Sequence, residues 1–343
     1  MMQVDFPLCL APMVGLSHVA LRSVIHDYLP ANSRTIWPTE MLNSRRLPFE
    51  DLAKVPESMR APHENSIVPQ ILGNEEKSTA ASVQKLQDWG AIGIDINMGC
   101  PVQKALKHNY GVALMGDSDY AASVVDMTVR NTNLPVSVKL RALGKEADSL
   151  DHLEQFTRKL IDAGAQKICL HPRTKEQQRR GKADWSQIKY LKSKLKIEII
   201  GNGDIQTADD VFAMIEETGC DQVMSGRGLA ARPWMMWQVA ERMGRGAPEG
   251  FEGRKAPVTP EEEAQEYGKC LLKLIDLSEL YFGEALAMRK VRFYVRTTSV
   301  WLDFGQELIG LCHKAKTCSE MKILVQDFFE KAIRMSPRTE LRQ

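Results

Sequence analysis

The sequence contains no pair of cysteines at the Cys-x-x-Cys spacing, although seven cysteines are scattered between Cys9 and Cys318. An odd number of scattered cysteines argues against a disulfide scaffold and against a zinc or iron–sulfur site. The N-terminus lacks the basic segment and apolar run of a signal peptide, and no apolar run approaches the roughly 20 residues of a membrane span. These absences favour a protein of the reducing cytoplasm, with no metal and no membrane partner.

The chain also lacks an excess of charge of either sign, because its formal net charge is +1 over 343 residues. Any contact with a nucleic acid must therefore depend on local clusters of basic residues. Hydrophobic residues make up 43% of the chain and charged residues 26%, which is typical of a globular protein. The length suits one domain of about 250 residues and a second, smaller one.

Eight short apolar or β-branched segments recur along the first two-thirds of the chain, and most are followed by a segment of helical periodicity. The expected strands are 8–11, 35–41, 67–72, 92–97, 136–141, 167–171, 197–201 and 222–225. The expected helices are 17–28, 75–89, 119–131, 150–163, 185–195 and 208–218. Eight alternating βα units in about 230 residues predict a TIM barrel, an α/β fold. A doubly wound sheet is the main alternative, but no Gly-x-Gly-x-x-Gly turn follows the first strand.

Two stretches interrupt this alternation. Residues 42–66 contain Arg-Arg-Leu-Pro, Val-Pro and Ala-Pro, which predict a loop in place of the second helix. Residues 244–258 are rich in glycine and proline and predict a linker. Beyond the linker, Thr259-Pro-Glu-Glu-Glu begins a helix with acidic residues in its first turn, and no strand pattern follows. We therefore expect a barrel domain over residues 1–243 and a small all-helical C-terminal domain over residues 259–343.

The last two expected strands end in Gly-rich turns, which are the usual place for a phosphate group in a TIM barrel. The first turn holds Asn202, Gly203 and Asp204, and the second holds Gly226 and Arg227. Glycine lets backbone N–H groups approach a phosphate, and an arginine adds a charge-assisted hydrogen bond. Tight turns without a ligand are the alternative interpretation. Because both strands carry the feature, we favour phosphate binding.

Polar side chains are also expected inside the barrel, close to these turns. Lys139 alternates with Val138 and Leu140, so it points toward the barrel axis if its neighbours face the helices, and an inward lysine needs an anion. His171 ends the adjacent strand, although a core histidine is the ordinary interpretation. Gln70 ends the third strand, and its amide is the right type to pair with an imide edge. A phosphate site, the cationic pair of Lys139 and His171, and an amide that can bind an imide edge together indicate a pocket for flavin mononucleotide (FMN). The reduced form of FMN is negative at its N1–C2 edge.

The turn after the fourth strand presents a thiol at the same end of the barrel. The run Gly-Ile-Asp-Ile-Asn-Met-Gly-Cys-Pro at 93–101 joins a buried strand to a turn that carries Asn97 and Cys100. Pro101 restricts the backbone directly after the cysteine. A buried structural cysteine is the ordinary interpretation of an isolated Cys. Beside a flavin pocket, we expect Cys100 to act as a proton donor.

Taken together, these segments resemble the tRNA-dihydrouridine synthases, a family of flavin enzymes with a TIM barrel and a helical C-terminal domain. The matching motifs are Ala-Pro-Met at 11–13, Gln-Ile-Leu-Gly at 70–73, Asp-Ile-Asn-Met-Gly-Cys-Pro at 95–101, Val-Lys-Leu-Arg at 138–141, His-Pro-Arg-Thr-Lys-Glu-Gln at 171–177, Gly-Lys-Ala-Asp-Trp at 181–185, Gly-Asn-Gly-Asp-Ile at 201–205 and Gly-Arg-Gly at 226–228. Each motif alone is weak, but together, in order and at strand ends, they are highly specific.

The resemblance implies that the protein reduces a specific uridine in tRNA to 5,6-dihydrouridine, with NADPH reducing the bound FMN. It implies that hydride passes to C6 of the uracil while Cys100 protonates C5. It implies further that Asn97 holds the uracil and that Lys104 and Arg141 lie near the RNA. The residues expected to contact FMN are Pro12, Met13, Val14, Gln70, Lys139, His171, Asn202, Gly203, Asp204, Gly226 and Arg227.

Two basic segments are expected to contact RNA. The loop after the sixth expected strand contains one acid, Glu176, and five cations: Arg173, Lys175, Arg179, Arg180 and Lys182. Residues 288–343 contain eleven Lys and Arg against six Asp and Glu, and they include Arg289 and Arg292. A solvated helix face is the ordinary explanation of such a charge run. Beside a uridine-reducing pocket, we favour RNA contact for Arg173, Arg289 and Arg292.

Three other functions account for parts of the pattern. A flavin barrel that acts on a free pyrimidine has no need of a basic helical domain. A non-catalytic RNA-binding barrel has no need to keep Cys100, Lys139 and His171. A Schiff-base aldolase that uses Lys139 leaves Gln70 and Arg141 unexplained. A visible absorption spectrum separates the flavin hypotheses from the others.

Overall fold

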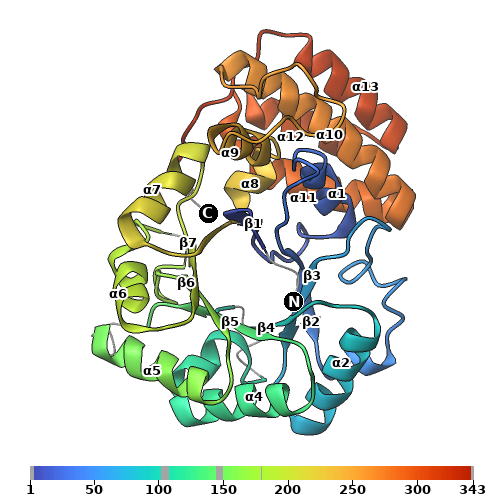
Figure 1. Ribbon diagram of the computed structural model, residues 1–343. Coiled ribbons are helices and arrows are strands. Elements are labelled where there is room, and N and C mark those ends of the chain that lie inside the picture. The colour runs from blue at the N-terminus through green and yellow to red at the C-terminus, as the bar shows by residue number, and fades with distance from the viewer. Residues whose placement is uncertain (1–3, 102–107, 144–149, 179, 341–343) are drawn as a thin grey trace.

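The computed structural model describes residues 4–101, 108–143, 150–178 and 180–340, and in this part of the chain eight parallel strands form a barrel (Figure 1). The strands are β1 (Leu8–Leu10), β2 (Trp37–Asn43), β3 (Ile67–Leu72), β4 (Ile94–Met98), β5 (Val136–Arg141), β6 (Lys167–His171), β7 (Glu198–Asn202) and β8 (Gln222–Ser225). Their order is β1-β8-β7-β6-β5-β4-β3-β2, so each strand lies beside its neighbours in the sequence. This order confirms the TIM barrel and excludes the doubly wound sheet, in which the strand order reverses.

The barrel is nearly closed at the seam between β1 and β2. These two strands have no ladder of backbone hydrogen bonds in the described residues, whereas every other neighbouring pair does. The seam is joined instead at the beginning of the strands, where the hydroxyl of Thr35, two residues before β2, donates to the carbonyl of Leu8, the first residue of β1, at 2.7 Å. The backbone N–H groups of Asp5 and Phe6 both donate to the Arg34 carbonyl at 3.1 Å.

Helices surround the strands, as the alternating pattern predicts (Figure 1). They are α1 (Val19–His26), α2 (Glu76–Asp88), α4 (Ser118–Arg130), α5 (Leu150–Asp162), α6 (Ser186–Lys194), α7 (Ala208–Thr218), α8 (Arg227–Ala231) and α9 (Met235–Arg242). Between β2 and β3 the chain forms turns and one short 3-10 helix, Leu47–Phe49, so the expected loop is confirmed. Prolines explain this, because they remove the N–H donors that an α-helix needs.

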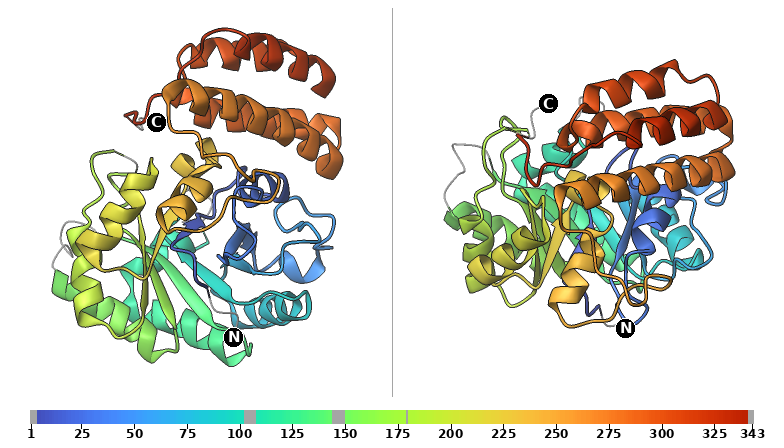
Figure 2. Two further views of the ribbon diagram at one scale, coloured as in Figure 1. Left: turned by 45° about the horizontal axis from the view of Figure 1, so that its top comes forward. Right: turned by 90° about the horizontal axis from the view of Figure 1, so that it is seen from above.

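A second layer of helices lies against the β1 side of the barrel (Figure 2). It consists of α10 (Pro260–Phe282), α11 (Glu284–Thr298), a 3-10 turn at Ser299–Trp301, α12 (Gly305–Lys314) and α13 (Cys318–Phe329). The first of these begins with a capping box, in which Thr259 and Glu262 satisfy each other's backbone N–H groups. The all-helical C-terminal region is therefore confirmed.

The helical layer and the barrel share one continuous hydrophobic core. Buried polar contacts cross the same boundary. Arg232, just after α8, pairs with Glu263 of α10 at 3.2 Å, and the Tyr294 hydroxyl of α11 donates to the Ala230 carbonyl at 2.9 Å. A division of the chain at residue 243 stays a prediction, and the shared core means that both parts would expose apolar surface if they were separated.

The barrel interior has a small apolar layer of its own. It consists of Cys9, Ala11, Cys169, Ile200 and Met224, which come from β1, β6, β7 and β8 and the turn after β1. All seven cysteines of the chain are free thiols and buried, as the odd, scattered count predicts. None of the helices in the described residues is long and apolar enough to span a membrane.

Candidate active site

Lys139 is a charged side chain in the interior of the barrel. Val138 and Leu140 are fully buried in the outer core, so Lys139 points inward, as the alternation of β5 predicts. The Lys139 ammonium donates to Asn202 Oδ1 of β7 at 3.0 Å, and the Asn202 amide donates to the Met224 carbonyl at 2.7 Å. No carboxylate of the described residues lies within ion-pair distance of Lys139. An ammonium has three donors, so Lys139 keeps capacity for an anionic ligand.

His171 stands at the end of the neighbouring strand β6 and is neutral. Arg173 lies 3.2 Å from its Nε2 atom, and a guanidinium only donates, so Nε2 accepts and Nδ1 carries the proton. Burial lowers the pKa of His171 well below its usual value, and the charges of Lys139, Arg141, Arg173 and Arg227 lower it further. His171 therefore offers an N–H donor, not a second cation, beside Lys139.

The glycines of the two Gly-rich turns lie close to neighbouring atoms, and at Gly203 and Gly228 too close for a side chain. Gly203 has a φ of +124°, and a Cβ there would lie 2.8 Å from the Ala183 Cβ. At Gly226 a Cβ would lie 3.1 Å from the Met13 sulfur. At Gly228 it would lie 2.1 Å from the Ile205 carbonyl oxygen, so this glycine is required by packing of α8 against the chain. The turn after β7 thus lies against His171 and the loop after β6, and the turn after β8 lies against the loop after β1.

A chain of oriented amides leads from the barrel interior to the turn that carries Cys100. Asp95 accepts from Gln70 Nε2 at 2.6 Å, and an ionised carboxylate only accepts, so Gln70 must turn its oxygen away. That oxygen accepts from Asn97 Nδ2 at 2.7 Å. Asn97 Oδ1 then accepts the backbone N–H groups of Gly99 at 3.1 Å and Cys100 at 2.9 Å. The carboxylate thereby sets the orientation of two amides and the position of the thiol turn.

The same contacts bear on the expected roles of Gln70 in binding FMN and of Asn97 in binding uracil. Gln70 is fully buried and Asn97 is buried, and each uses both ends of its amide within the protein. Their contacts with an imide edge of FMN and with uracil stay predictions. Asp95 was not among the expected site residues. Its alternation with Asn97 along one strand is the signal that places it inside the barrel.

Burial raises the pKa of Asp95 to about 6, against the opposing hydrogen bonds from Ser137 and Gln70 and the charge of Lys139. The folded state holds the proton of Asp95 more tightly than the unfolded chain does. Protonated Asp95 therefore contributes fully to the free energy of unfolding below pH 3.8, and this contribution is lost as the pH rises through 6. Asp95→Asn should abolish this loss. Its stability relative to the wild type should improve by about 2–3 kcal/mol between pH 4 and pH 7.5.

Urea unfolding of the flavin-free proteins at several pH values measures this difference. Ser137→Ala is the matched control, because it removes a hydrogen bond of 2.6 Å to Asp95 but leaves the carboxyl group to titrate. The control should keep the pH dependence of the wild type or steepen it. Parallel stability curves for wild type and Asp95→Asn would show that Asp95 does not titrate in this range.

The structure places two of the expected RNA-binding arginines inside the loops. Arg141 is 9% exposed and donates to the carbonyls of Gly99 and Gln178, both at 2.8 Å, so it ties the Cys100 turn to the loop after β6. Arg173 is 6% exposed and donates to the Gly181 carbonyl at 2.6 Å and to Asp204. Both guanidinium groups brace loops, which disfavours the expected contact with RNA.

Of the other expected residues, some are bonded within the protein and one is exposed to solvent. Asp204 accepts from Arg173 and from the Ala183 N–H at 2.7 Å, so its carboxylate holds the loop after β6, and its contact with a cofactor stays a prediction. Arg292 donates to the carbonyls of Cys312 at 3.1 Å and Ala315 at 2.8 Å, and thus caps the C-terminus of α12. Arg289 is exposed. Lys104 and Arg179 lie outside the described residues.

The loop after β1 holds the expected flavin contacts Pro12, Met13 and Val14, and it is tied to the helical layer. The next backbone N–H, that of Gly15, donates to Glu40 of β2 at 2.6 Å. Glu40 also pairs with Lys290 of α11 at 3.0 Å, and both side chains are buried. The local sequence pattern gives no sign of this pair, because nothing in it links β2 to a helix 250 residues later.

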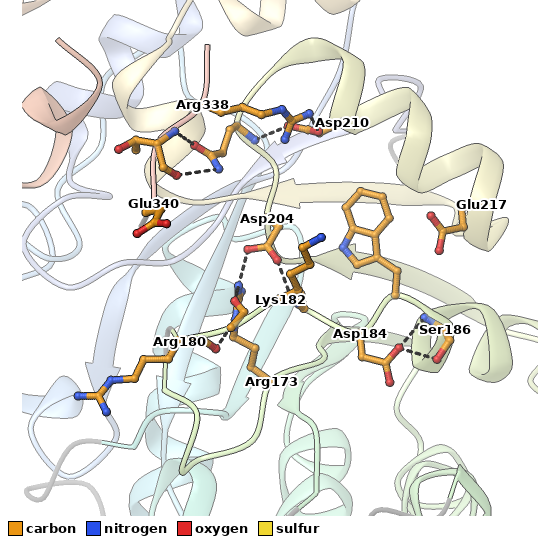
Figure 3. A pocket seen from close by; sticks show the side chains of 15 residues that line it. Arg173, Arg180, Lys182, Asp184, Ser186, Asp204, Asp210, Glu217, Arg338 and Glu340 are labelled. Atoms are coloured by element: carbon orange, nitrogen blue, oxygen red, sulfur yellow. Dashed lines mark hydrogen bonds and ion pairs between the residues drawn. The ribbon is translucent and has the colours of Figure 1, made fainter. Parts of the chain in front are cut away.

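A large cavity adjoins this centre but is separate from it. It has a volume of about 1380 Å³ and lies between the loop after β6, the start of α7 and residues 338–340. Figure 3 shows its wall, where Arg173 reaches Asp204 and Arg338 reaches Asp210. Among the expected site residues that the structure describes, Arg173 and Asp204 alone line it. Lys139 and His171 lie inside the barrel and do not line this cavity.

Comparison with known proteins agrees with this geometry. The model of the family described as Dihydrouridine synthase (Dus) matches residues 9–322. A probable tRNA-dihydrouridine synthase 1 of Synechocystis is 34% identical over 323 residues, covering 90% of this chain and 87% of the relative. The tRNA-dihydrouridine synthase B of Shewanella oneidensis is 28% identical over 335 residues, covering 96% and 98%. The match spans the strand ends that carry Cys100, Lys139 and His171, and the chain belongs to the dihydrouridine synthase family.

Proposed function

We propose that this protein uses FMN and NADPH to reduce a specific uridine of tRNA to 5,6-dihydrouridine. The observation that carries the proposal is the set of donors that converge inside the barrel, where Lys139 has no carboxylate partner among the described residues. Lys139 supplies a cation, His171 a neutral N–H and Asn202 a fixed amide. Gly203 of the first glycine turn lies against His171, and a side chain at this position would clash with Ala183.

These residues fit a flavin nucleotide. The turns after β7 and β8 would hold its phosphate, and Lys139 and the Nδ1–H of His171 would face its negative N1–C2 edge. A bound reduced flavin supplies the hydride that reaches C6 of the uracil. The inward lysine is stabilised by that negative charge, and the charge is stabilised by the lysine in a site shielded from water.

Cys100 supports the second half of the reaction. The thiol is 8% exposed, and Asn97 holds its backbone N–H at 2.9 Å. We assign to it the proton that C5 of the uracil receives. Arg141 fixes the preceding residue through the Gly99 carbonyl, so the turn is held from both sides. The seven free thiols fit a reducing compartment such as the cytoplasm.

The purified protein should be yellow and should contain one FMN per chain. With NADPH and unmodified tRNA it should form dihydrouridine, which mass spectrometry detects through the two added hydrogens. Free uridine monophosphate serves as the control substrate and should react poorly. A colourless protein that takes up no added FMN would contradict the flavin assignment, and efficient reduction of the free nucleotide would point to the pyrimidine alternative.

A further inference from the structure

We infer that the exposed face of α11 is a nucleobase-stacking surface for tRNA, with Phe293 as its centre. The inference rests on the proposed function, because it names the part of the surface that holds the RNA substrate. The face consists of Arg289, Phe293 and Arg296, which are spaced by four and three residues and therefore lie on one side of the helix. All three side chains are exposed.

The ring of Phe293 lies at the rim of the barrel. Its nearest atoms are 2.9–3.0 Å from the position that a Cβ on Gly15 would occupy, so the ring rests on that glycine. Gly15 follows Val14, which is 58% exposed, in the loop after β1. The buried pair of Glu40 and Lys290 holds the same loop to the same helix. Phe293 is thus fixed in place while 36% of it stays exposed.

The surroundings of the ring are cationic. The Arg296 guanidinium lies 5.9 Å from the ring centroid, and Arg289 lies one turn away on the other side. No acidic side chain of the described residues pairs with either arginine. The two arginines are separated by about 10 Å along the helix axis. An aromatic ring flanked by cations without acidic partners in the described residues suits a single strand of RNA, in which bases stack on aromatic faces and phosphates bind arginine.

An acidic peptide would also meet the two arginines, but it would gain nothing specific from an aromatic ring lodged beside the mouth of the barrel. An unpaired loop of RNA has bases to place there, because a target uridine must leave its stack to enter the pocket. The surface therefore takes a base of the tRNA on Phe293 and phosphates on Arg289 and Arg296.

The test measures the affinity of full-length, flavin-loaded protein for tRNA at several salt concentrations. Phe293→Ala should weaken binding about 5- to 100-fold without changing the slope of affinity against salt, because stacking releases no counterions. Phe293→Trp should bind at least as tightly as the wild type, and Phe293→Leu should bind less tightly. Arg289→Gln and Arg296→Gln should each lower the slope by about one.

Ile323→Ala is the matched control. Ile323 is a 57% exposed apolar residue on α13, which packs against α10 and α12 in the helical layer (Figure 2), and its removal should leave tRNA affinity unchanged. Flavin content is measured for every variant, as a check that the loop after β1 is intact. Equal affinity of the wild type and Phe293→Ala, with tRNA bound, would overturn the surface and make Phe293 a packing contact. Absence of tRNA binding by the wild type would overturn the proposed function itself.

Discussion

Replacement of Cys100 by alanine is expected to reduce dihydrouridine formation about 100- to 10,000-fold while the protein keeps its flavin. The thiol lies in a turn whose backbone is held by Asn97 and Arg141, so the loss of a sulfur atom leaves the turn in place. The flavin contacts proposed at Lys139, His171 and the glycine turns do not involve the thiol. Oxidation of NADPH with oxygen as acceptor should therefore continue in the variant.

Two further variants sharpen this measurement. Cys312→Ala removes a buried thiol in α12, outside the barrel, and should leave product formation close to that of the wild type. Cys100→Ser keeps a hydroxyl of similar size but is a much weaker acid, so it should resemble the alanine variant. Near wild-type turnover in Cys100→Ala would mean that another group protonates C5.

The second large effect concerns the contact between the helical layer and the barrel. Glu263→Ala is expected to lower the free energy of unfolding by about 3–5 kcal/mol, because it leaves a buried guanidinium without its carboxylate. Arg232 is fully buried and pairs with Glu263 at 3.2 Å, and Trp234 Nε1 also donates to Glu263 at 3.0 Å. Burial already lowers the pKa of Arg232, and Glu263 is the main opposing influence.

Urea unfolding measures the loss, and Glu261→Ala is its control. Glu261 lies two residues earlier in α10 and pairs with Arg334, but both side chains are about 60% exposed. An exposed pair is worth about 1 kcal/mol or less, so the control should be only slightly destabilised. Joint replacement of Arg232 by methionine and Glu263 by leucine should recover part of the loss, because no buried charge remains. Equal losses for Glu261→Ala and Glu263→Ala would show that the buried pair stabilises the protein no more than the exposed pair does.

The sequence alone determined the fold and most of the side-chain types of the candidate site. The strands β3, β5, β6 and β8 have the bounds expected from the pattern, because apolar runs between turn signals are a local property of the chain. The inward direction of Lys139 followed from alternation with two apolar neighbours, which is equally local. The loop between β2 and β3 followed from its prolines.

Only the tertiary structure decided which charged side chains are available to bind a ligand. Arg141, Arg173 and Arg292 look alike in the sequence, but their guanidinium groups are engaged with loop and helix carbonyls, whereas Arg289 is exposed. The pairing of Glu40 with Lys290 and the linkage of Asp95 through Gln70 to Asn97 join residues that are far apart along the chain. A residue's type states which hydrogen bonds and charges it offers, but its partners depend on the distances that folding creates, and these distances decide whether a cation binds a ligand or holds a loop.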